Sequence, residues 1–118
     1  MSFNKIKAMR NAERYLTQGK IQAAISEYKQ VVENDPKDVN SCNMLGDLYM
    51  KADDTRAAVN CYQEVADHYN SQGFAKKAIS IYNKIFKIEP DSMEVVSKLA
   101  ELYRVRGSIA EAKKHYKV

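Results

Sequence analysis

The residue types that most often carry out chemistry are few in this sequence, and their spacing suits none of the common reactions. The two histidines, His68 and His115, lie in separate predicted helices, and neither has a Glu or His at a metal-ligand spacing. Cys42 and Cys61 belong to no CxxC or Cys/His cluster, so we interpret both as reduced, largely buried thiols. No nucleophile with a base, carboxylate pair or phosphate-binding loop is visible. The sequence therefore predicts no enzyme, no metal site and no cofactor.

Four acidic residues recur with a regular spacing that could serve recognition. Glu13, Asp47, Asp67 and Glu101 are separated by 34, 20 and 34 residues, and each follows an alanine or a glycine. On one surface they would form an acidic ladder that attracts the Lys or Arg side chains of a basic partner and repels acidic ones. The alternative is that these residues lie on solvated helix faces, with Asp47 pairing with Lys51 one turn later. Both interpretations stay open at the level of sequence.

The acidic residues belong to a longer pattern that is repeated along the chain. Its clearest copy is Cys42-x2-Leu45-Gly46-x2-Tyr49 followed by Ala58-x3-Tyr62. The recurring positions are Ala12, Tyr15, Ala24, Tyr28 and Pro36, then Leu45, Gly46, Tyr49, Ala58 and Tyr62, then Ala66, Tyr69, Ala78, Tyr82 and Pro90, and finally Leu99, Ala100, Tyr103, Ala112 and Tyr116. All eight tyrosines occupy two of these positions. The pattern resembles the signature of the tetratricopeptide repeat (TPR) family over essentially the whole chain.

This resemblance implies an all-α fold, an α-solenoid of antiparallel helix-turn-helix hairpins forming one domain over residues 1–118. The repeats would cover about 5–38, 39–72 and 59–92, with an incomplete one at 93–118. Because the second and third copies overlap by 14 residues, they should share one long helix from about Asp54 to Gln72. We expect this shared helix to bend or offset the array, since a regular array alternates inner and outer helices.

Helical periodicity and end signals predict about seven helices. They cover residues 4–17, 21–34, 38–51, 55–71, 74–88, 92–105 and 109 to the end. Gly19, Gly73 and Gly107 are placed to end helices in a left-handed conformation, and prolines follow two of the helices. Asp91-x-x-Glu94 and Ser108-x-x-Glu111 are typical of capping boxes at helix starts.

The family resemblance implies a function in binding rather than catalysis. In similar proteins the first helix of each repeat lines a concave groove that holds a peptide or protein. The matching groove residues here are Met9, Arg10, Glu13, Asn43, Met44, Asp47, Met50, Asp67, Ser97, Lys98, Glu101 and Arg104. The Lys and Asn clamp by which some members grip a terminal carboxylate is absent, because Met9, Glu13 and Met44 occupy its positions. We expect a protein-interaction scaffold, with self-association through the C-terminal end as the alternative.

Composition argues against two other partner classes. The net charge of +4 comes from basic residues that are dispersed among 15 acidic ones, which is unlike a nucleic-acid footprint. Acidic groove residues would also repel phosphate, which opposes single-stranded RNA reading. The apolar runs are far shorter than the roughly 20 residues that a membrane span needs. We expect a cytoplasmic protein that binds no nucleic acid and inserts into no membrane.

The pattern breaks off in mid-repeat after Tyr116, and two interpretations of this end remain open. The chain is either the N-terminal part of a longer repeat protein or a natural chain whose exposed end is covered by self-association. The runs Glu64–Tyr69 and Gly73–Tyr82 look like those of long bacterial TPR proteins, so a bacterial origin is expected.

Overall fold

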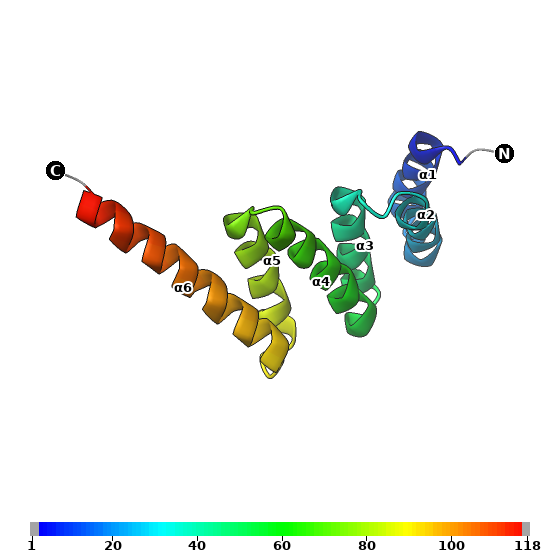
Figure 1. Ribbon diagram of the computed structural model, residues 1–118. Helices are drawn as coiled ribbons and strands as arrows, with labels where there is room; N and C mark the ends of the chain where they lie inside the picture. Colours follow the sequence, from blue (N-terminus) through cyan, green and yellow to red (C-terminus); the bar gives the residue numbers. More distant parts are fainter. Residues whose placement is uncertain (1–2, 117–118) are drawn as a thin grey trace.

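The structure is a computed structural model that describes the backbone of residues 3–116 and the side chains of residues 3–107. This part of the chain forms six helices: α1 (Lys5–Thr17), α2 (Ile21–Asn34), α3 (Val39–Lys51), α4 (Thr55–Ser71), α5 (Ala75–Ile88) and α6 (Met93–Tyr116). They follow one another along an elongated molecule of 58 × 32 × 22 Å (Figure 1). The expected all-α solenoid is confirmed, with six helices in the described residues in place of about seven.

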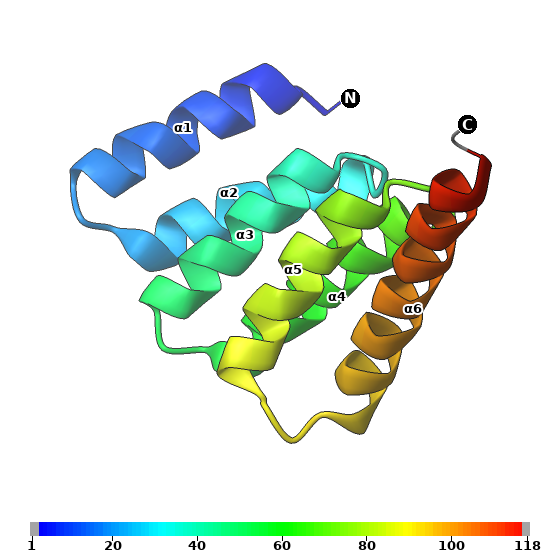
Figure 2. The ribbon, with the colours of Figure 1, turned by 90° about the vertical axis from the view of Figure 1, so that its left-hand side faces the viewer.

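The helices pack in the order in which they occur in the chain. Among the described residues, the helix pairs in contact are α1 with α2, α2 with α3, and so on to α5 with α6. In Figure 2, which looks along the array, α3 overlaps α2 and α5 overlaps α4, as expected for helices stacked in a row. The long helix α4 packs equally against α3 and α5. It is therefore the shared helix that the overlapping repeats predict, second in one hairpin and first in the next.

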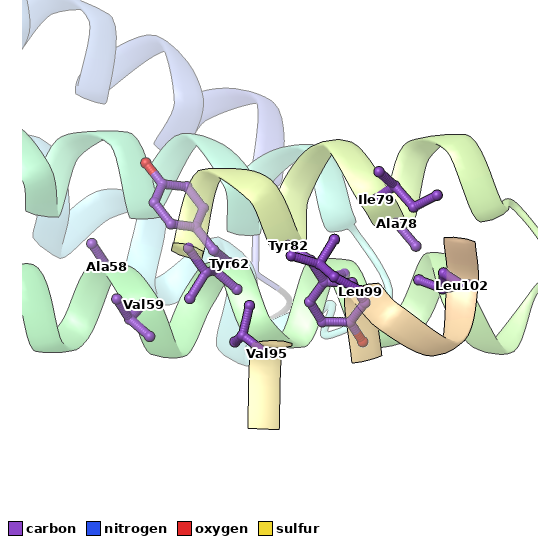
Figure 3. Packing of buried hydrophobic residues seen from close by; sticks show 11 residues of the cluster. Ala58, Val59, Tyr62, Ala78, Ile79, Tyr82, Val95, Leu99 and Leu102 are labelled. Atoms are coloured by element: carbon purple, nitrogen blue, oxygen red, sulfur yellow. The ribbon is translucent and has the colours of Figure 1, made fainter. Parts of the chain in front are cut away.

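Two apolar clusters form the core, and they meet at α3 and α4. The first lies between α1, α2 and α3 around Tyr28, which is 4% exposed. The second, drawn in Figure 3, lies between α4, α5 and α6 around Tyr62 and Tyr82. Tyr49 of α3 packs against both clusters, so the core is continuous. Tyr28, Tyr62 and Tyr82 are buried between packed helices, which is the packing that a large aromatic side chain favours.

The small residue Gly46 allows α3 and α4 to approach closely. A Cβ atom at this position would lie 2.6 Å from Cε1 of Tyr62, well inside van der Waals contact. Ala12 and Ala66, at the matching positions of α1 and α4, are fully buried. A small residue is therefore needed here for a packing reason, and not for backbone conformation.

The helix ends follow local signals, only some of which the sequence analysis identified. Gly19 and Gly73 adopt φ values of +73° and +81°, confirming the left-handed ends predicted after α1 and α4. Asp53 takes the same role after α3 with φ 60°, although it is not a glycine. The side chains of Asn4, Asp38 and Asp54 accept hydrogen bonds from backbone N–H groups in the first turns of α1, α3 and α4.

Two boundary predictions near the C-terminus are wrong. The backbone of α6 continues through Gly107 to Tyr116, so the turn predicted at residues 106–108 is absent and Ser108-x-x-Glu111 starts no helix. A glycine inside a helix costs only about 1 kcal/mol relative to alanine, which does not by itself force a turn. The start of α6 is capped by Ser92 and not by Asp91, since Ser92 Oγ accepts from the N–H of Val95 at 3.4 Å.

Candidate functional site

Asp47 lies in a three-residue cluster that joins alternate helices. Tyr62 of α4 donates its hydroxyl proton to Asp47 Oδ1 of α3, with 2.5 Å between the oxygens. Lys84 of α5 places Nζ at 2.9 Å from the same carboxylate oxygen and 4.4 Å from the centroid of the Tyr62 ring. We call Asp47, Tyr62 and Lys84 the central rung. The ammonium group of Lys84 therefore balances the charge of the Asp47 carboxylate from within the protein.

Asp67 lies in a second cluster of the same design, one helix further along the chain. Tyr82 of α5 donates a hydrogen bond to Asp67 of α4. Lys98 of α6 pairs with Asp67 at 2.6 Å and lies 5.6 Å from the centroid of the Tyr82 ring. We call Asp67, Tyr82 and Lys98 the C-terminal rung. In both rungs the tyrosine follows the acid by 15 residues.

The proton positions in these rungs follow from burial and charge. Burial, together with the hydrogen bond to Asp67, raises the pKa of Tyr82 to about 12, although Lys98 opposes the shift. Burial and the bond to Asp47 likewise raise the pKa of Tyr62. The hydrogen bond to Asp67 raises the pKa of Lys98. At neutral pH each tyrosine is therefore a neutral donor, and Lys98 is a cation.

The two rungs point in opposite directions. Figure 3 shows the hydroxyl of Tyr62 and that of Tyr82 directed away from each other. The central rung joins α3 and α5, whereas the C-terminal rung joins α4 and α6. This reversal arises because α4 is the second helix of one hairpin and the first of the next. Asp47 and Asp67 therefore do not line one continuous surface.

The two outer members of the predicted ladder differ from the central pair. Glu101 pairs with Arg104 of the same helix at 2.6 Å, one turn later. Glu13 of α1 is exposed, and among the described residues its carboxylate makes no ion pair or hydrogen bond. The positions that correspond to Asp67, Tyr82 and Lys98 are here Glu13, Tyr28 and Met44. We call these three residues the N-terminal rung, which lacks a lysine.

A surface depression of about 330 Å³ lies beside the N-terminal rung. Its lining residues come from α1, α2, α3 and the α2–α3 connection: Lys5, Met9, Tyr28, Asp38, Asn40, Ser41 and Met44. At one end Lys5 pairs with Asp38 at 2.5 Å and with Asp35 at 3.2 Å. Burial would raise the pKa of Asp38, but hydrogen bonds from Lys5 and Ser41 outweigh it and lower this pKa. The charges at the Lys5 end of the depression therefore balance. Glu13 follows Met9 by one turn of α1, so an acidic side chain lies toward the other end.

The remaining predicted groove residues are distributed over several surfaces. Ser97, Lys98 and Glu101 line a second depression of about 460 Å³ between α6 and the α4–α5 connection. Arg10 lines a separate depression on α1 and does not join Met9. Met50 packs against the second core cluster. Asn43 is half-buried, and its Oδ1 atom has no hydrogen-bond partner among the described residues.

The motif positions of α6 are much more exposed than those of the preceding helices. Val96 is 38% exposed, whereas Cys42 and Tyr62 at the matching positions of α3 and α4 are 3% and 1% exposed. Tyr103 is 51% exposed, and Ala100 is exposed too. Within the part of the chain that the structure describes, no further helix covers this surface. Ala112 and Tyr116 lie outside the described side chains.

The remaining candidate residues take packing positions. Cys42 and Cys61 are free thiols, as expected, and the pKa of Cys42 is raised by its hydrogen bond with Cys61 and by burial. His68 stacks edge-on against Tyr69, with 6.2 Å between the ring centroids. In residues 3–107 no three His, Cys, Asp or Glu side chains gather where they could hold a metal ion. Across the described helices, none combines the length and apolar character that crossing a membrane requires.

Helical hairpins stacked in a row, with small residues at the crossings and tyrosines between them, define an α-helical repeat protein. Residues 15–72 match the family described as tetratricopeptide repeat. This segment belongs to the tetratricopeptide-repeat family. No curated protein matches its sequence.

Among three solved structures of similar shape, the one with a TM-score of 0.50 supports the fold. A crystal structure of MamA protein has a TM-score of 0.50 at 24% identity, covering 96% of this chain and 69% of that one. A second MamA structure has a TM-score of 0.49 at 24% identity, covering 96% and 74%. The first TPR of Spaghetti (RPAP3) bound to an HSP90 peptide has a TM-score of 0.46 at 15% identity, covering 87% and 95%. At this level of identity, MamA supports the solenoid fold alone.

Proposed function

We propose that this protein is an interaction scaffold that holds an extended segment of another protein on the surface formed by α1 and α3. Modules of the tetratricopeptide-repeat family generally bind proteins and catalyse no reaction. The proposal includes the cytoplasmic location expected from the sequence. It does not depend on one groove running along the whole array, because the rungs on α3 and α4 point to opposite sides.

The observation that carries the proposal is the depression beside the N-terminal rung. Met9 and Met44, which the sequence analysis assigned to a groove, both line it although they are 35 residues apart. Met44 is 41% exposed, so its flexible side chain is accessible to a ligand. Methionine adapts to varied apolar shapes and is common on surfaces that bind peptides. The depression therefore offers an apolar floor between a balanced polar end and an acidic end.

Selection from a display library of random dodecapeptides tests this proposal. Peptides enriched on the wild-type protein should bind the variant carrying Met9→Ala and Met44→Ala at least about tenfold more weakly, since two apolar contacts are lost. A matched control carries Gln22→Ala and Gln30→Ala on the exposed face of α2. Fluorescence anisotropy gives the Kd values, and circular dichroism checks that all variants are equally helical.

Two results would contradict peptide binding at this surface. One is that no peptide is enriched above a non-binding protein. The other is that both double variants weaken the selected peptides equally, because a site on α1 and α3 cannot be affected by α2 substitutions on the opposite face.

A second candidate function is self-association through α6. Its support is the exposure of Val96, whose matching residues in α3 and α4 are buried, and of Tyr103, whose matching residues are half-buried. In a helical repeat array such a surface normally receives the next helix. A second copy of the chain would satisfy this requirement, and the array would then grow by stacking.

Light scattering over a wide concentration range separates the two candidates. If α6 drives association, the molar mass of the wild type rises with concentration. The molar mass of Val96→Glu stays at the value of the monomer. The matched control is Ile6→Glu, which places the same charge at an exposed apolar residue of α1. A wild-type protein that stays monomeric at every concentration would exclude the self-association candidate.

A further inference from the structure

Two of the three rungs show how this fold accommodates a basic side chain. In the central rung a lysine ammonium group contacts the acid at 2.9 Å while lying over the tyrosine ring. In the C-terminal rung the arrangement is repeated with a distance of 2.6 Å. The two lysines come from different sequence positions, 37 and 31 residues after their acids. The acid and tyrosine therefore constitute a cation site, which the protein fills in two different ways.

The N-terminal rung has an acid, here a glutamate, and a tyrosine at the same positions but no internal cation. Glu13 precedes Tyr28 by 15 residues, as in the other two rungs. Met44 occupies the position of Lys98, and its side chain reaches the same depression as Tyr28. Methionine is close to lysine in length and apolar character, but it carries no charge. The apolar part of the site is thus present, and the positive charge is missing.

The electrostatic surroundings of Glu13 favour a cation from outside the chain. The carboxylate is exposed and, among the described residues, lacks an ion-pair partner. Burial raises the pKa of Tyr28, and the negative charges of Glu13 and Asp38 raise it further. The neighbouring cation Lys5 is already held by Asp35 and Asp38. A second negative charge near the open end would therefore be repelled, and a positive one attracted.

We infer that the N-terminal rung is a specificity site for a lysine or arginine of the bound segment, whose charged group contacts Glu13 while its stem lies on Met9 and Met44. This inference rests on the proposed function and names the chemistry of its partner. It narrows the predicted acidic ladder from four residues to one. The charges of the other three acids are already balanced by Lys84, Lys98 and Arg104, so these acids attract a partner's cation less strongly than Glu13 does.

The decisive variant is Met44→Lys, which supplies the missing cation from within the chain. Peptides selected on the wild type should carry Lys or Arg at a recurrent position, and replacing that residue by norleucine should weaken binding about threefold. On Met44→Lys, and on Glu13→Gln, the two peptides should bind equally. The control Gln30→Lys adds the same charge on the exposed face of α2 and should preserve the preference for lysine over norleucine.

The outcomes separate this inference from the proposed function. If selected peptides bind the Met9 and Met44 surface but norleucine replaces lysine without effect, the rung inference is wrong and the peptide-binding function stands. If no peptide is selected, a capped Ala-Lys-Ala probe decides, with Ala-norleucine-Ala as its control. A saturable shift of the Glu13 carboxyl carbon resonance with the lysine probe alone supports the site. Equal or absent shifts overturn it.

Discussion

The α1–α3 and α4–α6 regions use the same three positions for opposite purposes. In α4–α6 the acid, tyrosine and lysine of the C-terminal rung satisfy one another within the protein. In α1–α3 the lysine is replaced by Met44, and Glu13 remains exposed. The helices of both regions cross at fully buried alanines, Ala12 and Ala66. We call a rung closed when its lysine pairs with its acid, and open when it has no lysine. The helices pack in the same way in both cases, so one substitution at the third position changes the charged surface without changing the packing.

The largest disruption of a closed rung should come from Gly46→Leu. The new side chain must displace the Tyr62 ring, which lies 2.6 Å from the Cβ position, and so separate α3 from α4. Overpacking of this kind should reduce the free energy of unfolding by about 3 kcal/mol. Urea denaturation followed by circular dichroism measures it. Gly107→Ala is the matched control: among the side chains of residues 3–107, none lies within 4 Å of its Cβ position, so it should stabilise α6 slightly.

A smaller effect should appear when the closed rungs are exposed to high pH. Because the folded pKa of Tyr82 is raised from 10.0 to about 12, the stability it contributes is complete below pH 10 and is lost as pH rises through 12. The wild type should therefore lose more stability over this interval than Tyr82→Phe, which has no hydroxyl to ionise. Urea midpoints at each pH, with ultraviolet absorbance of tyrosinate, test this. Equal losses in the two proteins would show that the Asp67 bond is unimportant.

The hydroxyl groups themselves should distinguish closed rungs from the open one. Tyr62→Phe leaves Asp47 without its donor and should cost about 1 kcal/mol of unfolding free energy. Tyr28→Phe should cost less, since no hydrogen bond joins Tyr28 to Glu13 in residues 3–107. Chemical denaturation of both variants makes the comparison. A larger loss for Tyr28→Phe would mean that the N-terminal rung is already closed.

The smallest effect should come from exchanging the third residue of the rungs. Lys98→Met opens the C-terminal rung and should cost roughly 0.5 kcal/mol, because the ion pair is partly exposed to solvent. Met44→Lys closes the N-terminal rung and should add roughly 0.3 kcal/mol. Both differences in the free energy of unfolding should become smaller at high salt. Thermal unfolding at low and high ionic strength is the measurement, and salt-independent changes would argue against an electrostatic origin.

The sequence was sufficient to predict most of the fold because the repeat pattern constrains contacts as well as helices. Small residues at Gly46 and Ala66 predict close crossings, and a spacing of 20 residues between them predicts a shared helix. The structure contains both features. The continuous helix α6 was not predictable in this way. Gly107 is compatible with either a turn or a helix, and the choice depends on packing rather than on the glycine itself.

The closed rungs were harder to predict than the acids that belong to them. Lys98 was expected to face a partner, yet it pairs with Asp67. Lys84 was not identified at all, because a second helix of a repeat is not expected to reach the first helix of the previous one. It does so here, since Lys84 of α5 pairs with Asp47 of α3 at 2.9 Å. A signal existed in retrospect: a lysine stands two residues after the motif tyrosine Tyr82.

The shared helix also governs how the array comes apart. In a solenoid of independent repeats, each unit can melt while its neighbours remain folded, and a single unit can be removed or exchanged. Here α4 supplies Tyr62 and Ala66 to one apolar cluster and Cys61 to the margin of the other. Melting α4 therefore removes support from both sides at once, and no cut at a repeat boundary leaves two complete halves. We therefore expect the middle of the molecule to unfold as one cooperative unit and unfolding to begin at the ends.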